Sequence, residues 1–168
     1  KVAANRADRE SSEGAALAKV NDDNTAGVLL SVNCETDFVA KNDAYQQLAH
    51  ALVDHALGFD TKDAFLSSKF YGMTVAEKLT EQTGVIGEKI EIGGFSKLSA
   101  PYVGSYIHAG NKIATLAGIS GIVDNAAEIA KNVAMQAAAM NPIALNKDGV
   151  DATIVEKEIE IAKDQLRQ

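Results

Sequence analysis

Two apolar runs with a polar turn between them form the first regular pattern of the chain. Residues 14–20 and 26–32 are rich in Ala, Val and Leu, and Asn-Asp-Asp-Asn at 21–24 is a strong turn signal. We therefore predict a β-hairpin.

The segment after this hairpin changes to the period of a helix. Apolar residues recur at 3.6-residue spacing over 43–57, and Gly58 is expected to end that helix. The predicted apolar stripe comprises Tyr45, Leu48, Ala49, Leu52 and Ala56. A second, short helix is predicted over 61–70, starting at Thr61.

A capping box and an alternating run follow. Thr74-Val75-Ala76-Glu77 has the spacing of a capping box, and we expect Gly84 to close the helix that it starts. Residues 89–92 alternate between polar and apolar, which predicts a strand that ends at the glycine pair 93–94.

The pattern then starts again. Gly-Ser-Tyr-Ile at 104–107 resembles Gly-Ala-Ala-Leu at 14–17, and a turn at 109–111, a strand over 113–117 and a helix over 124–140 follow. We infer a duplicated ββα unit. The predicted fold class is α+β, with two layers, antiparallel three-stranded sheets and helices on one face.

The last residues predict one more helix and complete the division into domains. Residues 151–168 place Val155, Ile159, Ala162 and Leu166 at 4-3-4 spacing, which suits the start of a coiled-coil arm. The predicted domains are an N-terminal core subdomain with a leading linker (1–101), a partial C-terminal core subdomain (102–144) and the first part of a helical arm (145–168).

Composition narrows the classes of protein. Hydrophobic residues make up 46% and aromatic residues 5%, so the core must be mostly Ala, Leu, Ile and Val. The net charge is −7 with no basic cluster, which disfavours nucleic acid and favours a protein partner. A single cysteine excludes an intrachain disulfide and fits a reducing compartment.

The chain ends carry no targeting signal that we recognise. The first ten residues lack Met and an apolar segment, so they are not a signal peptide and look like a cut end. We therefore expect a fragment. Its charge-free stretches are too short and polar to span a bilayer.

Candidate enzyme chemistry is weak. Cys34 could act as a nucleophile with His50, His55 or His108 as base, but a lone cysteine at a strand end is more often a small buried hydrophobe. His50 and His55 are separated by roughly 140° around a helix, which disfavours a shared metal ion. The glycines at 84, 87, 93 and 94 lack a phosphate-loop motif. We predict no catalytic residue, metal or cofactor.

One connection differs between the two copies of the repeat. Residues 33–42 join strand to helix in the first copy, whereas the shorter 118–123 does so in the second. The longer connection holds Thr36-Asp37-Phe38-Val39. Either Phe38 packs in its own core and Asp37 caps the following helix, or an exposed Phe38 fills a partner's apolar pocket beside the Asp37 charge. The residues alone favour the core interpretation, and both stay open.

The motif around this connection resembles the signature of the bacterial elongation factor Ts family, the nucleotide exchange factors of elongation factor Tu. Further segments are similar to the family in the same order. The matching segments are VNCETDFVAKND (32–43), IGEKIEI (86–92), GSYIHAGNKIATL (104–116), AMQAAAMNP (134–142) and VEKEIEIAKDQ (155–165).

The resemblance implies a core of two similar subdomains, which agrees with the inferred repeat. It also implies an N-terminal helical module, a coiled-coil hairpin, the remaining strands of the second subdomain and a C-terminal tail. We expect this chain to lack the N-terminal module and to stop within the first arm of the hairpin. The implied function is guanine-nucleotide exchange on elongation factor Tu during translation elongation in the cytoplasm. It needs no cofactor, nucleic acid or membrane, and it leaves a homodimer open.

The resemblance also assigns partner contacts to particular residues. Phe38 would wedge between partner helices near the Mg²⁺ site, and Asp37 would help to displace the groups that hold the ion. Further contacts carried over from the family, all to the partner's G domain, are Thr36, Val39, Ile86, Gly87 and His108. For His108 a plain turn position is the alternative.

Two departures from the family pattern are visible. Glu35 replaces a common glutamine and would add a charge beside Asp37, and IHAGN at 107–111 replaces a more basic turn. Two rival functions remain: a Cys34-dependent enzyme, and an interaction module that pairs helices through 151–168.

Overall fold

The predicted hairpin is present. The computed structural model describes Arg6 and residues 8–167. In it β1 (Glu13–Val20) pairs antiparallel with β2 (Ala26–Cys34), and Val20 lies opposite Gly27. Alternate β2 side chains, among them Val28 and Leu30, are buried, as a strand covered on one face requires.

A third strand completes this sheet and corrects one prediction. β5 (Glu91–Ser99) pairs antiparallel with β2, so the strand continues through the glycine pair at which we expected it to end. The register shifts there, because Ser31 lies opposite Gly94 and Val32 opposite Ile92. Gly93 is the extra residue of a β-bulge, where a Cβ atom would lie 2.5 Å from Nδ2 of the Asn33 side chain.

Helices cover one face of this three-stranded sheet. α2 (Asp43–Ala56) buries Tyr45, Leu52 and other residues of its stripe, close to the predicted bounds. α3 (Lys62–Ser67) begins one residue after the predicted start, with Thr61 as its cap. It ends earlier than predicted, because the next residues form β3 (Lys69–Phe70), which pairs with β4 (Met73–Thr74).

The helix α4 (Val75–Ile86) confirms the capping box and corrects its predicted end. Thr74 and Glu77 exchange the two expected hydrogen bonds. The helix runs through Gly84 and ends at Gly87, whose φ of 81° is the left-handed conformation that favours glycine. The helix therefore stops where the backbone needs a positive φ, not at the first glycine.

The second ββα unit is also present. β6 (Tyr102–Ile107) and β7 (Ala114–Ile119) form a two-stranded antiparallel sheet, followed by α5 (Ala126–Met140), which ends at Asn141-Pro142 as predicted. Among the described residues this sheet has two strands, in contrast to the three of the first unit. Gly104 lets α5 approach closely, since a Cβ atom there would lie 2.5 Å from the Ala130 Cβ atom.

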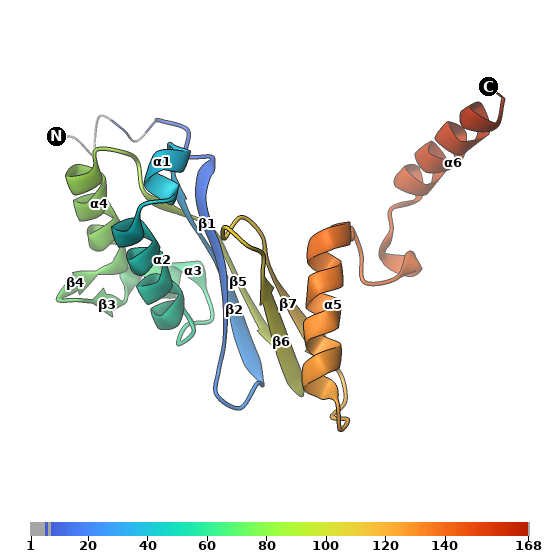
Figure 1. Cartoon of the computed structure of the whole chain (residues 1–168), viewed down its shortest axis with the longest axis horizontal. Coiled ribbons are helices and arrows are strands. Elements are labelled where there is room, and N and C mark those ends of the chain that lie inside the picture. Colours follow the sequence, from blue (N-terminus) through green and yellow to red (C-terminus); the bar gives the residue numbers. More distant parts are fainter. Residues whose placement is uncertain (1–5, 7, 168) are drawn as a thin grey trace. The chain divides into compact units, whose positions relative to one another are not determined.

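The two units stack sheet on sheet. Figure 1 shows α2 and α4 on one side of the first sheet, β6 and β7 on its other side, and α5 beyond them. The Val103 amide donates to the Asn24 carbonyl at 2.6 Å, and the Ala16 amide donates to the Asn111 carbonyl at 2.7 Å. The α+β class with antiparallel sheets is confirmed, and each unit has its helices on its outer face.

The chain divides into two compact units, 1–138 and 139–168. The second contains a short 3₁₀ helix, η2 (Lys147–Gly149), and α6 (Ala152–Leu166), which Asp151 caps. Apolar side chains of α6, including Ile159 and Leu166, are exposed. The pairing of α6 in a coiled coil and the boundaries 1–101, 102–144 and 145–168 stay predictions. Every helix of the described chain is too short or too polar to cross a bilayer.

Candidate functional site

A one-turn helix lies inside the connection that the sequence singled out. α1 (Asp37–Ala40) follows β2 after two residues, and Thr36 caps it by accepting a hydrogen bond from the Val39 amide at 3.4 Å. Ala40 is buried and anchors the end of α1. Asn42 then caps α2.

This helix presents Phe38 to solvent. The Phe38 side chain is 83% exposed, so the interpretation that places it in the core is wrong. Asp37 does not cap the following helix either, because Asn42 does. A large aromatic side chain exposed on an anchored turn is unusual, since such groups normally lose water contact on folding.

Asp37 carries a paired charge on the same turn. The Lys41 ammonium lies 2.7 Å from its carboxylate, and this hydrogen bond and charge hold the pKa of Asp37 below its ordinary value. Both side chains are well exposed, and a solvated ion pair contributes little stability. Asp37 is therefore a carboxylate that can exchange Lys41 for another cation at small cost.

A shallow groove lies beside Phe38. Its volume is about 330 Å³, and it is lined by Phe38, Val39, Asn42, Tyr45 and Ile86. Ile86 is the last residue of α4, and Gly87 follows as its cap. The structure thus brings the predicted residues of α1 together with those at the end of α4.

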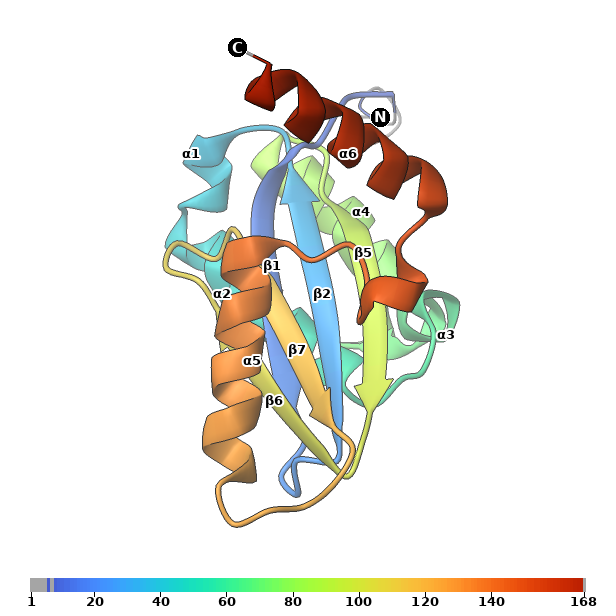
Figure 2. The same cartoon turned by 90° about the vertical axis from the view of Figure 1, so that its right-hand side faces the viewer.

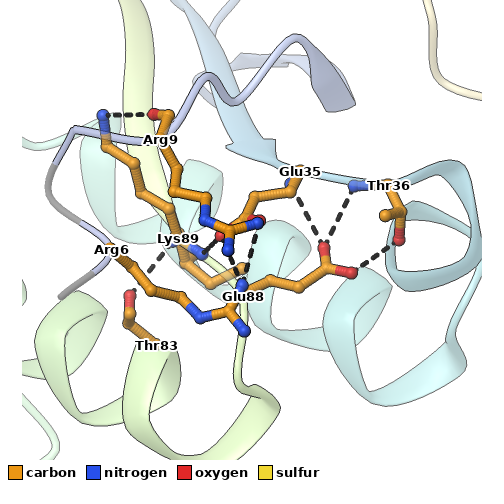
Figure 3. A network of polar contacts seen from close by, with 8 residues as sticks. Arg6, Arg9, Glu35, Thr36, Thr83, Glu88 and Lys89 are labelled. Carbon is orange, nitrogen blue, oxygen red and sulfur yellow. Dashed lines mark hydrogen bonds and ion pairs between the residues drawn. The ribbon is translucent and has the colours of Figure 1, made fainter. Parts of the chain in front are cut away.

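The Glu88 carboxylate connects the start of α1 to the end of α4. Glu88 accepts hydrogen bonds from the Thr36 amide (3.0 Å), the Thr36 hydroxyl (2.7 Å) and the Glu35 amide (3.2 Å), as Figure 3 shows. These bonds fix the start of α1 to the chain just after Gly87.

Glu35 makes the reciprocal contact. Its carboxylate accepts the Lys89 amide at 2.7 Å and Arg6 at 2.9 Å, and Arg9 lies 3.5 Å away. The Lys89 amide and then Arg6 hold the pKa of Glu35 below its ordinary value. The side chain is only 11% exposed, and the charge that we expected beside Asp37 is paired with Arg6 and Arg9.

His108 lies in the turn between β6 and β7. Its ring Nδ1 is 2.9 Å from the Tyr106 hydroxyl, and its side chain is exposed. The Asn111 side chain in the same turn donates to Gln46 at 2.7 Å, and Gln46 in turn donates to the Ala40 carbonyl at the end of α1. Figure 2 shows this turn close to α1 and α2. The turn that carries His108 is therefore linked to α1 through Asn111 and Gln46. Of the other predicted residues, Phe38, Val39 and Ile86 line the groove, and Thr36, Asp37 and Gly87 adjoin them in the chain.

Sequence reasoning missed Glu35, Gln46 and Glu88 as supports of the site. Residues 35 and 88 are 53 apart in the chain, and only the pairing of β2 with β5 brings them together. The local signal for Glu88 is its place directly after Gly87, where a connection begins. Connections leave backbone amides unpaired, and these amides need acceptors such as a carboxylate.

Cys34, the candidate nucleophile, is not activated in this structure. Cys34 is buried, its thiol donates to the Thr36 carbonyl, and burial raises the pKa of the thiol. His55 packs beside Phe65 with its Nε2 atom 2.8 Å from the Ser68 hydroxyl, and burial lowers its pKa. His50 is exposed. Within Arg6 and 8–167, no three His, Cys, Asp or Glu residues gather as metal ligands would.

Comparison with known proteins agrees with the motifs. A family model described as Elongation factor TS matches residues 35–168. Elongation factor Ts of Christiangramia forsetii is 65% identical over 168 residues, covering 100% of this chain and 61% of that protein. Elongation factor Ts of Flavobacterium psychrophilum is 62% identical over 167 residues, covering 99% of this chain and 61% of that protein.

A third relative has the same name. Elongation factor Ts of Flavobacterium johnsoniae is 56% identical over 159 residues, covering 95% of this chain and 49% of that protein. The chain thus spans about half to three fifths of the length of these curated relatives. The family model matches most of the length of this chain, beginning at Glu35 within the VNCETDFVAKND motif. The chain therefore belongs to the elongation factor Ts family.

Proposed function

We propose that this chain contains the core of a guanine-nucleotide exchange factor that acts on elongation factor Tu during translation elongation in the cytoplasm. The observation that carries the proposal is Phe38, 83% exposed on a helical turn that is anchored at both ends. An exposed aromatic side chain on a rigid support is what a protein needs to fill a partner's apolar pocket.

The proposed mechanism needs no chemistry by the factor itself. A GTPase holds its nucleotide through a phosphate cradle and a Mg²⁺ ion, and Mg²⁺ tolerates little distortion of its octahedral shell. A factor that binds the nucleotide-free state more tightly than the loaded state lowers nucleotide affinity. Because coupling is reciprocal, tight nucleotide binding equally releases the factor.

In this mechanism Phe38 separates partner helices near the Mg²⁺ site and Asp37 competes for groups that hold the ion. The weak, exposed pair between Asp37 and Lys41 leaves the carboxylate available for this role. Anchoring of α1 matters because a side chain held in place before binding loses less conformational entropy in the complex.

The end of α4 supplies a second contact in the proposal. Ile86 lines the groove beside Phe38, and Gly87 adds no side chain that would keep a partner's backbone away. Thr36 and Val39 shape the turn, and His108 contributes from the neighbouring β6–β7 turn.

One other function has a specific observation behind it. The apolar side chains of α6 are exposed, which favours helix pairing by residues 151–168. If the chain were only such a module, deletion of 151–168 would abolish partner binding. Our proposal instead expects some exchange that depends on Asp37 and Phe38 to remain after this deletion.

The decisive experiment measures release of a fluorescent GDP analogue from elongation factor Tu, with and without this chain. Phe38→Ala should slow the accelerated release about tenfold or more, because truncation of a central aromatic contact commonly costs at least 2 kcal/mol. Tyr71→Ala is the matched control, since Tyr71 is another exposed aromatic residue (77%) on the β3–β4 turn. Equal effects of the two substitutions, or no acceleration by the unaltered chain, would refute the proposal.

A further inference from the structure

We infer that Glu88 is a positioning residue for the proposed exchange function. It holds the Phe38 turn (α1, residues 37–40) and the Ile86–Gly87 corner at the end of α4 in a fixed arrangement. The inference rests on the proposed function and adds to it a residue that does not itself touch the partner. It starts from three hydrogen bonds that converge on a single carboxylate.

The first step is the position of Glu88 in the chain. It directly follows Gly87, the left-handed cap of α4, and Ile86 before that cap lines the groove. Its two oxygens reach across to residues 35 and 36, which lead into α1. One side chain therefore spans the two segments that the proposal assigns to the partner.

The second step is what α1 lacks without this carboxylate. A helix of four residues is far too short to be stable alone. The Glu35 and Thr36 amides precede the helix, and their hydrogen bonds go to Glu88. Loss of that acceptor would leave two part-buried amides without these bonds and free the turn to move.

The third step concerns the Thr36 hydroxyl. It donates its only proton to Glu88 and accepts a hydrogen bond from the Val39 amide. Because the proton is committed to the carboxylate, an oxygen lone pair stays directed at the Val39 amide. Glu88 thereby orients the cap of the helix that carries Phe38.

The second carboxylate of this site is paired with cations. Glu35 lies close by, but its charge is matched by Arg6 at 2.9 Å and by Arg9 at 3.5 Å. The two carboxylates thus bind each other's segments reciprocally: Glu88 accepts from the amides of residues 35 and 36, and Glu35 accepts from the Lys89 amide (Figure 3).

The experiment combines two readouts on the 168-residue chain. Amide hydrogen exchange by NMR reports whether the Glu35 and Thr36 amides are protected, and the GDP-analogue assay reports exchange. Glu88→Ala should reduce the protection of both amides and slow the accelerated release, each by about tenfold to a hundredfold, the range for a lost hydrogen bond to a charged group. Glu88→Gln should give intermediate values, since its amide group retains one acceptor oxygen.

Glu77→Ala is the matched control. Glu77 also accepts a backbone amide and a threonine hydroxyl, both from Thr74, but it does so at the opposite end of α4. We expect this substitution to leave the Glu35 and Thr36 amides and the rate of release unchanged. A slower release with Glu77→Ala, equal to that with Glu88→Ala, would mean that general stability and not positioning sets the rate.

A double substitution separates positioning from direct contact. In a Phe38→Ala background, Glu88→Ala should slow release less than it does in the unaltered chain, because Phe38, one of the groups that Glu88 positions, is already absent. Full additivity of the two effects would overturn the positioning role, as would unchanged amide protection in Glu88→Ala. If the unaltered chain fails to accelerate release, the exchange assignment falls and the functional part of this inference falls with it. A normal rate with Glu88→Ala refutes Glu88 alone.

Discussion

The exposure of Phe38 has a direct consequence for stability. Full burial of a phenylalanine side chain contributes about 1.5–3 kcal/mol, and Phe38 is 83% exposed, so less than a fifth of that is at stake, about 0.5 kcal/mol or less. Alanine also has the higher helix propensity, which offsets part of the loss. Phe38→Ala should therefore change the free energy of unfolding by no more than about 0.5 kcal/mol.

Phe65 provides the comparison. It is fully buried in the same core unit and packs against Phe59 and Phe95. Phe65→Ala should cost about 3–5 kcal/mol, because the substitution loses burial and leaves a cavity.

Urea unfolding followed by circular dichroism measures both variants, with the slope against urea as a check that the same surface is exposed. The reasoning is refuted if Phe38→Ala loses more than about 1.5 kcal/mol. Such a loss would place Phe38 in the core, the interpretation that the residues alone favoured. Unchanged stability together with slow nucleotide release would separate the functional role of this side chain from folding.

Three further predictions concern other parts of the chain. Thr83→Val should lower the free energy of unfolding by about 1–3 kcal/mol, because the buried hydroxyl accepts a hydrogen bond from the Ile90 amide at 3.0 Å. Thr83→Ser keeps this acceptor and should therefore keep most of the stability. Gly104→Ala should cost about 1–3 kcal/mol by pushing α5 away at Ala130, so a neutral result in urea unfolding would contradict the close approach. Burial lowers the pKa of His55 below its ordinary value of 6.5, so its contribution is complete above that pH and is lost as the pH falls through the folded-state pKa. The unaltered chain should therefore lose more stability between pH 7.5 and 5 than His55→Gln does, as urea unfolding at the two pH values would measure.

Local signals in the sequence were enough for most element starts. The turn at 21–24, the Thr61 cap and the capping box at Thr74 each depend on side chains that bond to backbone groups within five residues. The helical stripe of α2 depends only on period. Such features are fixed by neighbours along the chain, so they can be predicted without knowing the fold.

Glycine positions were predicted less well. Gly84 and Gly87 look alike in sequence, yet only Gly87 adopts the left-handed conformation that ends α4. The pair at 93–94 was expected to end a strand and instead forms a bulge against Asn33. A glycine permits many conformations, and the one adopted depends on which distant backbone lies against it.

The candidate site divides in the same way. The motif around Asp37 and Phe38, with its family resemblance, singled out this segment from the sequence alone, and its role in partner binding stays a prediction. Whether Phe38 faced the core or the solvent was decided by the tertiary structure, because α1 turns Ala40 inward and leaves Phe38 outside. The hydrogen bond between the Glu35 amide and the Glu88 carboxylate depends on the pairing of β2 with β5, two strands far apart in sequence. Local bonding preferences fixed the elements, and long-range pairing of those elements fixed which side chains meet and which remain exposed.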